Sequence, residues 1–220
     1  MTSRKSDSNG FFRDLPILYI YETFILVIVL VLAKPNTTSL CLGIVLSLLG
    51  ATVRVWTRGY PKEKNDASIY GPYKFVRHPH QLGTFLILLG LCVASRSPIV
   101  TAMMLLGSIF LFREVFKEEE KLGGGRRGVL YQDYRLRVPT FIPALLPYKG
   151  ALLKNNYFSL SVAMGQNQKR ELNALFALVF VYILLFGTTK MAQPLPWQLG
   201  SGILVLVYSF FTLLARRRHA

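Results

Sequence analysis

Six long apolar runs constrain the fold of this chain more than any other feature of its sequence. They cover residues 17–33, 40–55, 82–94, 99–112, 172–189 and 199–215. A helix that crosses the hydrocarbon core of a bilayer needs about 20 residues, with about 17 as a lower limit. The first, fifth and sixth runs meet or approach this length, whereas the third and fourth are short and separated only by Ser95-Arg96-Ser97-Pro98. We therefore expect an all-α, polytopic membrane protein with about six transmembrane helices, two of which form a short helical hairpin.

The basic residues are distributed unequally between the segments that flank these runs. If the runs are numbered as spans, Lys34, Arg96 and Lys190 fall on one side of the membrane, and the other 23 of the 26 Lys and Arg residues fall on the opposite side. Short basic loops stay in the cytoplasm, so we expect both termini to be cytoplasmic. The net charge of +15 does not indicate nucleic acid, because a nucleic-acid-binding protein has no reason to alternate basic segments with membrane spans. Membrane lipids are the expected partners, since anionic headgroups attract basic segments.

The sequence predicts one membrane domain over residues 1–220, with a mobile polar N-terminus at residues 1–13 and a C-terminal helical pair at residues 172–215. The fourth run should continue as a helix into the cytoplasm, followed by a short amphipathic helix over residues 129–137. Residues 140–148 hold two prolines and several apolar side chains, which is typical of a loop at the membrane interface.

A cationic group precedes the third run, where the stretch from Gly71 to Gly83 reads GPYKFVRHPHQLG. Arg77 and His78 stand at the mouth of a predicted span, where charge is costly without a partner. A site for an anionic group is one interpretation, because guanidinium and imidazole groups bind carboxylates and phosphates. Anchoring to lipid headgroups is the alternative. Pro79 suits the first turn of the third helix, where a missing N–H costs nothing.

Three adjacent carboxylates follow the fourth run, at Glu118, Glu119 and Glu120. Neighbouring residues on a helix point about 100° apart, so one or two of them can face a site. A solvated charged face is the alternative. Neither the two Cys nor the three His residues have the spacing of zinc ligands, so we expect no metal site.

Taken in order, these motifs resemble the isoprenylcysteine carboxyl methyltransferase-like family of integral-membrane methyltransferases, which includes the phospholipid methyltransferases. The matching pieces are Gly71-Pro72-Tyr73, Arg77-His78-Pro79, Gly83, Glu119-Glu120, Gly128, Tyr131, Tyr134 and Arg137-Val138-Pro139, with Arg54, Trp56 and Gly59 upstream. The resemblance covers roughly residues 54–143, the methyltransferase-like catalytic region. Two departures stand out: Gln81 replaces a tyrosine of the family pattern, and the glycine run at residues 123–125 replaces apolar helix residues.

This resemblance implies S-adenosyl-L-methionine as the cofactor, bound on the cytoplasmic side. The cofactor-binding residues it implies are Ala67, Ser68, Tyr73, Arg77, His78, Pro79, His80, Gln81, Glu119 and Glu120. The catalytic residues it implies are Arg113 and Glu119, with Arg113 contacting the methyl acceptor. The expected activity is methyl transfer to a lipophilic acceptor, with a prenylcysteine-type carboxylate favoured.

Several alternatives remain open at this point. A phospholipid amine or a small thiol would also fit a lipid-facing pocket. A sterol-reductase-like enzyme would use NADPH instead. A non-catalytic membrane lipid-binding protein would keep the fold without the chemistry.

Overall fold

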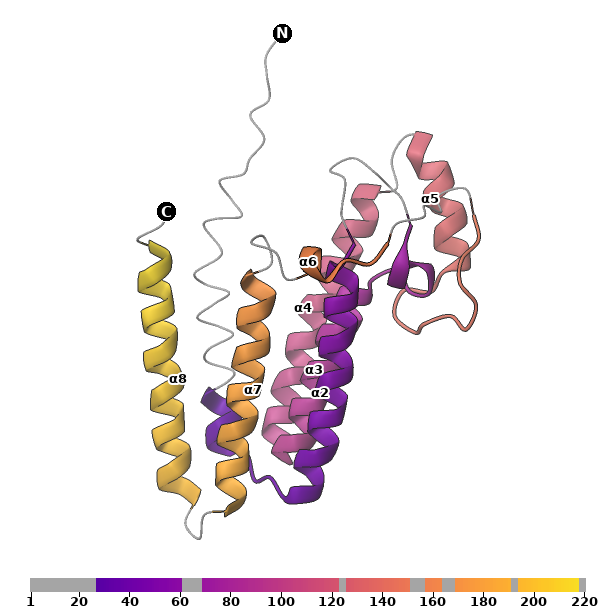
Figure 1. Cartoon of the computed structure of the whole chain (residues 1–220). Helices are drawn as coiled ribbons and strands as arrows, with labels where there is room; N and C mark the ends of the chain where they lie inside the picture. Colours follow the sequence, from indigo (N-terminus) through magenta and orange to yellow (C-terminus); the bar gives the residue numbers. More distant parts are fainter. Residues whose placement is uncertain are drawn as a thin grey trace.

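All regular elements that the structure describes are helices, as expected (Figure 1). The structure is a computed structural model, and it describes residues 27–60, 69–122, 126–150, 157–163, 169–190 and 194–217. Residues 27–32 form a helical segment that precedes the first labelled helix. The elements are α2 (Thr37–Arg58), the 3₁₀-helix η1 (Gly71–Lys74), α3 (Pro79–Ser95), α4 (Pro98–Leu122), α5 (Arg126–Arg137), α6 (Leu160–Ala163), α7 (Lys169–Lys190) and α8 (Pro194–Arg217). The predicted N-terminal tail at residues 1–13 lies outside the described residues.

Five long helices run side by side in alternating directions, so that α2, α4 and α8 end where α3 and α7 begin (Figure 1). The expected hairpin is confirmed, because only Arg96 and Ser97 separate α3 from α4. Arg96 makes the turn in the left-handed conformation, with φ 49° and ψ 25°. The helix after the fourth run extends to Leu122, and α5 begins three residues before the predicted start at residue 129.

Glycines allow α2 and α3 to approach each other closely. Gly43 and Gly50 lie seven residues apart on α2, and Gly83 and Gly90 have the same spacing on α3. A Cβ atom on Gly50 would lie 2.5 Å from the carbonyl oxygen of Gly83, and one on Gly43 would lie 2.5 Å from that of Gly90. Small residues at such contacts let the backbones of membrane helices pack directly together. These contacts fix the register between the two helices.

The core lies where the segment 27–32, α2, α3, α4, α7 and α8 meet. Its buried residues are Val29, Leu30, Ala33, Leu40, Leu91, Ala94, Val100, Met104, Val181, Tyr182, Leu184, Leu185 and Val205. Polar groups inside the bundle are paired: the hydroxyls of Ser47 and Tyr182 lie 2.7 Å apart, and Trp197 Nε1 donates to the carbonyl of Leu184 at 3.1 Å. The first contact joins α2 to α7 and the second joins α8 to α7.

The outer surface of the bundle is apolar. The helix α2 and residues 173–190 of α7 are long and apolar enough to cross a membrane. Only 33% and 28%, respectively, of the most apolar 18-residue stretch of each lies buried inside the bundle. Leu42, Leu48 and Ile183 are 56%, 58% and 60% exposed. A helix in the core of a soluble protein would bury such side chains, so this surface indicates association with a membrane.

The number of spans is smaller among the described residues than the six runs suggest. Besides the two long helices there are three shorter apolar ones: α3, the part Pro98–Ile109 of α4 and the part Pro196–Val207 of α8. The 17 residues of α3 extend about 26 Å, slightly less than the roughly 30 Å of a hydrocarbon core. Most of the first run lies outside the described residues, and the count of six stays a prediction.

The sequence predicts that Lys34, Arg96 and Lys190 lie on the side of the membrane opposite the other Lys and Arg residues, and these three residues do share one end of the bundle. The backbone N–H of Lys34 donates to the carbonyl of Ser95 at 2.8 Å, so Lys34 lies beside the turn that contains Arg96. Lys190 ends α7 at the same end (Figure 1). The stretch 71–83 lies at the opposite end.

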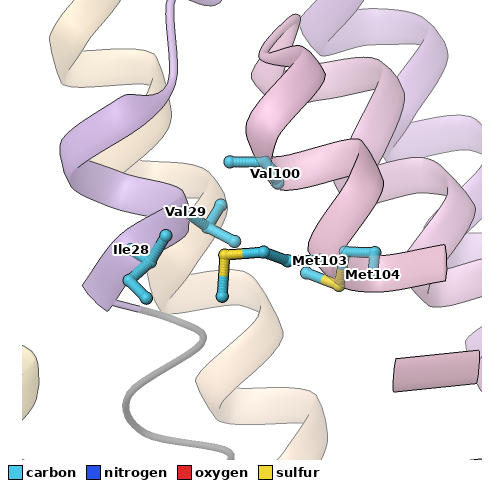
Figure 2. A pocket seen from close by; sticks show the side chains of 5 residues that line it. All are labelled: Ile28, Val29, Val100, Met103 and Met104. Atoms are coloured by element: carbon cyan, nitrogen blue, oxygen red, sulfur yellow. The ribbon is translucent and has the colours of Figure 1, made fainter. Parts of the chain in front are cut away.

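A small apolar depression opens between the segment 27–32 and the start of α4 (Figure 2). Its lining side chains are Ile28, Val29, Val100, Met103 and Met104. Their side chains carry no charge and no hydrogen-bond donor, and the thioether sulfurs of Met103 and Met104 are only weak acceptors. Since they lie near the hairpin turn, this depression is remote from the motifs at the other end and does not suit a charged cofactor.

Candidate functional site

Two segments that are far apart in the sequence lie antiparallel at the end of the bundle where α2 ends and α3 begins. Three backbone hydrogen bonds join them: Arg77 N to Pro139 O at 2.9 Å, Ala144 N to Phe75 O at 2.8 Å, and Tyr148 N to Lys74 O at 2.9 Å. The Arg77-His78-Pro79 motif therefore lies directly against the Arg137-Val138-Pro139 motif. We call residues 139–148 the covering segment.

A sharp turn precedes the cationic pair. Gly71 has a positive φ of 52°, a conformation that costs little only for glycine. The ring of Tyr60 occupies the space that a Cβ atom on Gly71 would need. Pro72 follows with its side chain fully buried, which fixes the direction of η1. The glycine is thus required both by its backbone angle and by the neighbouring ring.

Aromatic packing on α5 supports this arrangement. The side chains of Tyr134 and Tyr148 are buried with ring centroids 5.4 Å apart, and the Tyr134 hydroxyl donates to the carbonyl of Tyr73 at 2.8 Å. The Tyr148 hydroxyl donates to Asp133 Oδ2 at 3.0 Å, while Arg137 Nε donates to Asp133 Oδ1 at 2.8 Å. Burial raises the pKa of the Tyr148 hydroxyl above its ordinary value, and the hydrogen bond to Asp133 raises this pKa further.

The covering segment encloses the motif residues Arg77 and His78. The guanidinium of Arg77 donates to the hydroxyl of Thr140. His78 is only 6% exposed, and its ring centroid lies 6.5 Å from that of Phe141. The His78 carbonyl accepts the backbone N–H of Leu82 at 3.0 Å, because His78 is the N-cap residue of α3. Access to the His78 ring therefore depends on where Thr140 and Phe141 lie.

A second polar group joins α2 to α3 beside the motif. Arg58 Nη2 and His80 Nε2 lie 3.0 Å apart. A guanidinium can only donate, so Nε2 accepts and the ring proton is assigned to Nδ1. Arg54 Nη1 donates to Thr84 Oγ1 at 3.3 Å, and that hydroxyl donates to the carbonyl of His80 at 3.1 Å. Two arginines from α2 thus meet the first turn and a half of α3.

The structure brings together the part of the predicted site that lies before the third run. Tyr73, Arg77, His78, Pro79 and His80 gather at this end of the bundle, and Gln81 is half-buried in the first turn of α3.

The other predicted site residues are less completely placed. Arg113 is exposed on α4, and Glu119 and Glu120 belong to the last turn of the same helix. The side chains of Glu119 and Glu120 lie outside the described part of the chain, as do Ala67 and Ser68 entirely. Whether the acidic residues face the cationic ones therefore stays a prediction.

Sequence reasoning did not single out Arg58, Thr84, Thr140 or Phe141. A signal for the first two is present in the sequence, because Arg54 and Arg58 share a helix face, as do His80 and Thr84. The matched seven-residue glycine spacings could have paired those two faces. For Thr140 and Phe141 the sequence offers no comparable periodic signal, since they lie in a loop.

Comparison with known proteins gives one partial likeness. A cobalt-zinc-cadmium resistance protein, CzcN, from Cupriavidus metallidurans is 30% identical over 111 residues. The match covers 50% of this chain and 50% of that protein, so the chain spans about half the length of this curated relative. No family description matches the sequence, and no solved structure matches it either. In the described part of the chain, no group of three or more His, Cys, Asp or Glu residues could hold a metal ion.

Proposed function

We propose that this chain is an integral-membrane, S-adenosyl-L-methionine-dependent methyltransferase that acts on a lipophilic acceptor. The observation that carries this proposal is the hydrogen bond from Arg77 N to Pro139 O at 2.9 Å. This bond joins the Arg77-His78-Pro79 motif to the Arg137-Val138-Pro139 motif at one end of an apolar bundle. A polar cofactor from the cytosol and an apolar acceptor from the bilayer can meet only at such an end.

The proposed topology has six spans, with both termini and the site on the cytoplasmic side. It rests on the charge distribution, in which Lys34, Arg96 and Lys190 fall at the end of the bundle away from the motif. Under the positive-inside rule, the end that is poor in Lys and Arg faces outward.

The residues present suit this cofactor in their chemistry. Its carboxylate needs cationic donors, which Arg77 and the Arg58–His80 pair supply. Its adenine ring needs a flat apolar surface, which Phe141, with its ring centroid 6.5 Å from that of His78, would offer. Tyr73, in the 3₁₀-helix η1 that precedes Arg77 in the chain, would offer a second aromatic surface. A carboxylate from the run that contains Glu119 would accept from the cofactor ammonium or the ribose hydroxyls. When bound, the cofactor supplies an electrophilic methyl group.

The role of the protein in this proposal is alignment and exclusion of water. Methyl transfer is an in-line displacement, and correct alignment supplies much of the rate enhancement. The covering segment would keep water from the donor end of the site. Arg113 would hold a carboxylate acceptor by charge without becoming a nucleophile, so no covalent enzyme intermediate forms.

A prenylcysteine-type carboxylate is the acceptor we favour, because a carboxylate needs no general base. A phospholipid amine must lose a proton first and would require one. A small thiol would also fit a lipid-facing pocket. Transfer of tritiated methyl groups in membrane extracts, followed by identification of the labelled product, distinguishes these three acceptors.

Binding of S-adenosyl-L-methionine to the purified full-length protein tests the site. His78→Ala and Glu119→Ala should each weaken binding by roughly tenfold or more, as expected when a charged or buried hydrogen-bonding partner is removed. Arg96→Gly is the matched control, because it removes a cation at the opposite end and relaxes a left-handed residue. Tight binding that neither His78→Ala nor Glu119→Ala changes would contradict this site.

Thermal stabilisation by other ligands separates the remaining classes. Stabilisation by NADPH but not by S-adenosyl-L-methionine would favour a sterol-reductase-like enzyme. Normal folding without affinity for either cofactor would favour a non-catalytic lipid-binding protein.

The relative from Cupriavidus metallidurans supports a second proposal, that this chain contributes to resistance against cobalt, zinc or cadmium. Growth of a deletion strain on these metals, complemented with the wild type or with His78→Ala, tests it. If resistance depends on His78, the two proposals describe one site. Resistance that is fully restored by a variant without cofactor binding would separate the metal phenotype from methyl transfer.

A further inference from the structure

Four large aliphatic side chains outside the apolar runs are almost fully exposed at the end of α5 and along the covering segment. Leu136 is 88% exposed, and Ile142, Leu145 and Leu146 are 80%, 98% and 81% exposed. Insertion of the bundle helices into a bilayer does not account for them, because none of the four belongs to a bundle helix. Large aliphatic side chains that are exposed this close together in the chain are typical of a surface that contacts an apolar partner.

Cations accompany these side chains. Arg135, Arg137 and Lys149 are exposed, whereas Asp133 is the only acidic residue between residues 132 and 150. The carboxylate of Asp133 is already engaged by Arg137 and Tyr148. The segment thus combines aliphatic side chains with an excess of positive charge, which complements an anionic lipid surface.

The position of the segment agrees with this partner. Figure 1 shows the loop after α5 beside the bundle, at the level of the upper parts of α2 and α3. Near this end α2 carries Arg54 and Arg58, whereas its exposed apolar side chains Leu42, Val45 and Leu48 lie earlier in the helix. The three backbone hydrogen bonds to residues 74–77 keep the loop at that level.

We propose that residues 136–149 insert their aliphatic side chains into the headgroup–acyl boundary of an anionic leaflet. Arg135 and Lys149 then lie among the lipid phosphates. A second copy of the chain is a poorer partner, because a two-fold contact would bring the same cations against one another. This inference holds whether or not the chain transfers methyl groups, and it makes the membrane a direct neighbour of the candidate site.

Site-directed spin labelling of the full-length protein in lipid nanodiscs tests the proposal. In a background with Cys41→Ser and Cys92→Ser, a nitroxide is attached to Leu145→Cys or, as a second probe, to Ile142→Cys. Gln132→Cys is the matched control, since Gln132 is exposed on the neighbouring helix α5. Collisions with dissolved oxygen report the membrane phase, and collisions with a water-soluble nickel chelate report the aqueous phase.

We expect the labels at 142 and 145 to shift toward high oxygen and low nickel accessibility in nanodiscs that contain phosphatidylglycerol, while the label at 132 stays aqueous. The shift should be smaller in phosphatidylcholine alone, and Lys149→Gln should reduce the difference between the two lipids. Equal nickel accessibility at 132, 142 and 145 in the anionic nanodiscs would overturn the proposal. Dipolar broadening between labelled chains at 145, with low oxygen accessibility, would overturn it in favour of self-association.

Discussion

The backbone N–H of Arg77 lies 2.9 Å from the carbonyl oxygen of Pro139, and this hydrogen bond joins the start of α3 to the segment that follows α5. Because the guanidinium of Arg77 also donates to Thr140, both the backbone and the side chain of one residue hold the covering segment in place. The enclosure of His78 follows from this double attachment. A change that loosens the covering segment should therefore also alter the candidate site around His78.

Removing the hydroxyl of Thr140 should loosen this attachment. Thr140→Val keeps the shape of the side chain but removes the acceptor for Arg77, and we expect the docked segment to lose roughly 1 kcal/mol of stability. Amide hydrogen exchange at Arg77 and Ala144 should become faster, and S-adenosyl-L-methionine should bind more weakly. Thr140→Ser keeps a hydroxyl and should behave like the wild type. Unchanged exchange in Thr140→Val would show that the backbone bonds alone hold the segment.

Tyr148 should make the attachment sensitive to alkaline pH. Since its pKa is raised in the folded protein, the folded state keeps a proton that the unfolded state releases above about pH 10. The stability of the segment is thus present below about pH 10 and falls as the pH rises through the raised pKa. Limited proteolysis within residues 139–150 should accelerate over that range.

Tyr148→Phe is the control for this pH dependence. It should lose about 1 kcal/mol at neutral pH, because the hydrogen bond to Asp133 is gone. The additional loss above about pH 10 should be absent. An identical alkaline profile in the variant would assign the effect to another tyrosine.

Gly50 should tolerate no larger side chain. A Cβ atom there would lie 2.5 Å from the carbonyl oxygen of Gly83 and 2.9 Å from the amide nitrogen of Ile87, so Gly50→Ala must push α2 and α3 apart. Overpacking of this kind costs about 1–3 kcal/mol. Gly200→Ala is the matched control, because nothing lies within 4 Å of the corresponding position on α8. Unfolding by a denaturing detergent should separate the two variants clearly.

The contact between Ser47 and Tyr182 should contribute modestly to the packing of α2 against α7. Their hydroxyls lie 2.7 Å apart, and hydrogen bonds between membrane helices average about 0.6 kcal/mol in double-mutant cycles, with a maximum of about 1.7 kcal/mol. A cycle of Ser47→Ala and Tyr182→Phe should give a coupling energy in this range. A coupling energy near zero would mean that each hydroxyl finds another partner when the first is removed.

Much of the helical arrangement follows from local signals. Pro79 begins α3 because its fixed φ and missing N–H suit the first turn of a helix. Ser95 to Pro98 contain the short turn of the predicted hairpin, and the charged continuation of the fourth run extends to Leu122. The number of spans was harder to predict, since the short runs fall near the limit at which an apolar helix can cross a bilayer.

The candidate site was predictable only in part. The sequence places His80 beside Arg77 and His78 along the chain, but nothing local indicates that Arg58 lies 3.0 Å from the His80 ring. That contact depends on the rotation and register of α2 against α3. Likewise, the prediction of an interfacial loop at residues 140–148 did not include its backbone pairing with residues 74–77.

The sequence by itself determined roughly which stretches form the long helices, which surfaces are apolar and where positive charge concentrates, while several helices begin a few residues before the predicted starts. These properties depend on residues that are near one another in the chain. Only the tertiary structure decided which polar groups meet, because the glycine contacts between α2 and α3 fix their relative register and the bonds from Arg77 fix the covering segment. Contacts of this kind depend on the shapes of two distant segments at once, so neither segment specifies them alone.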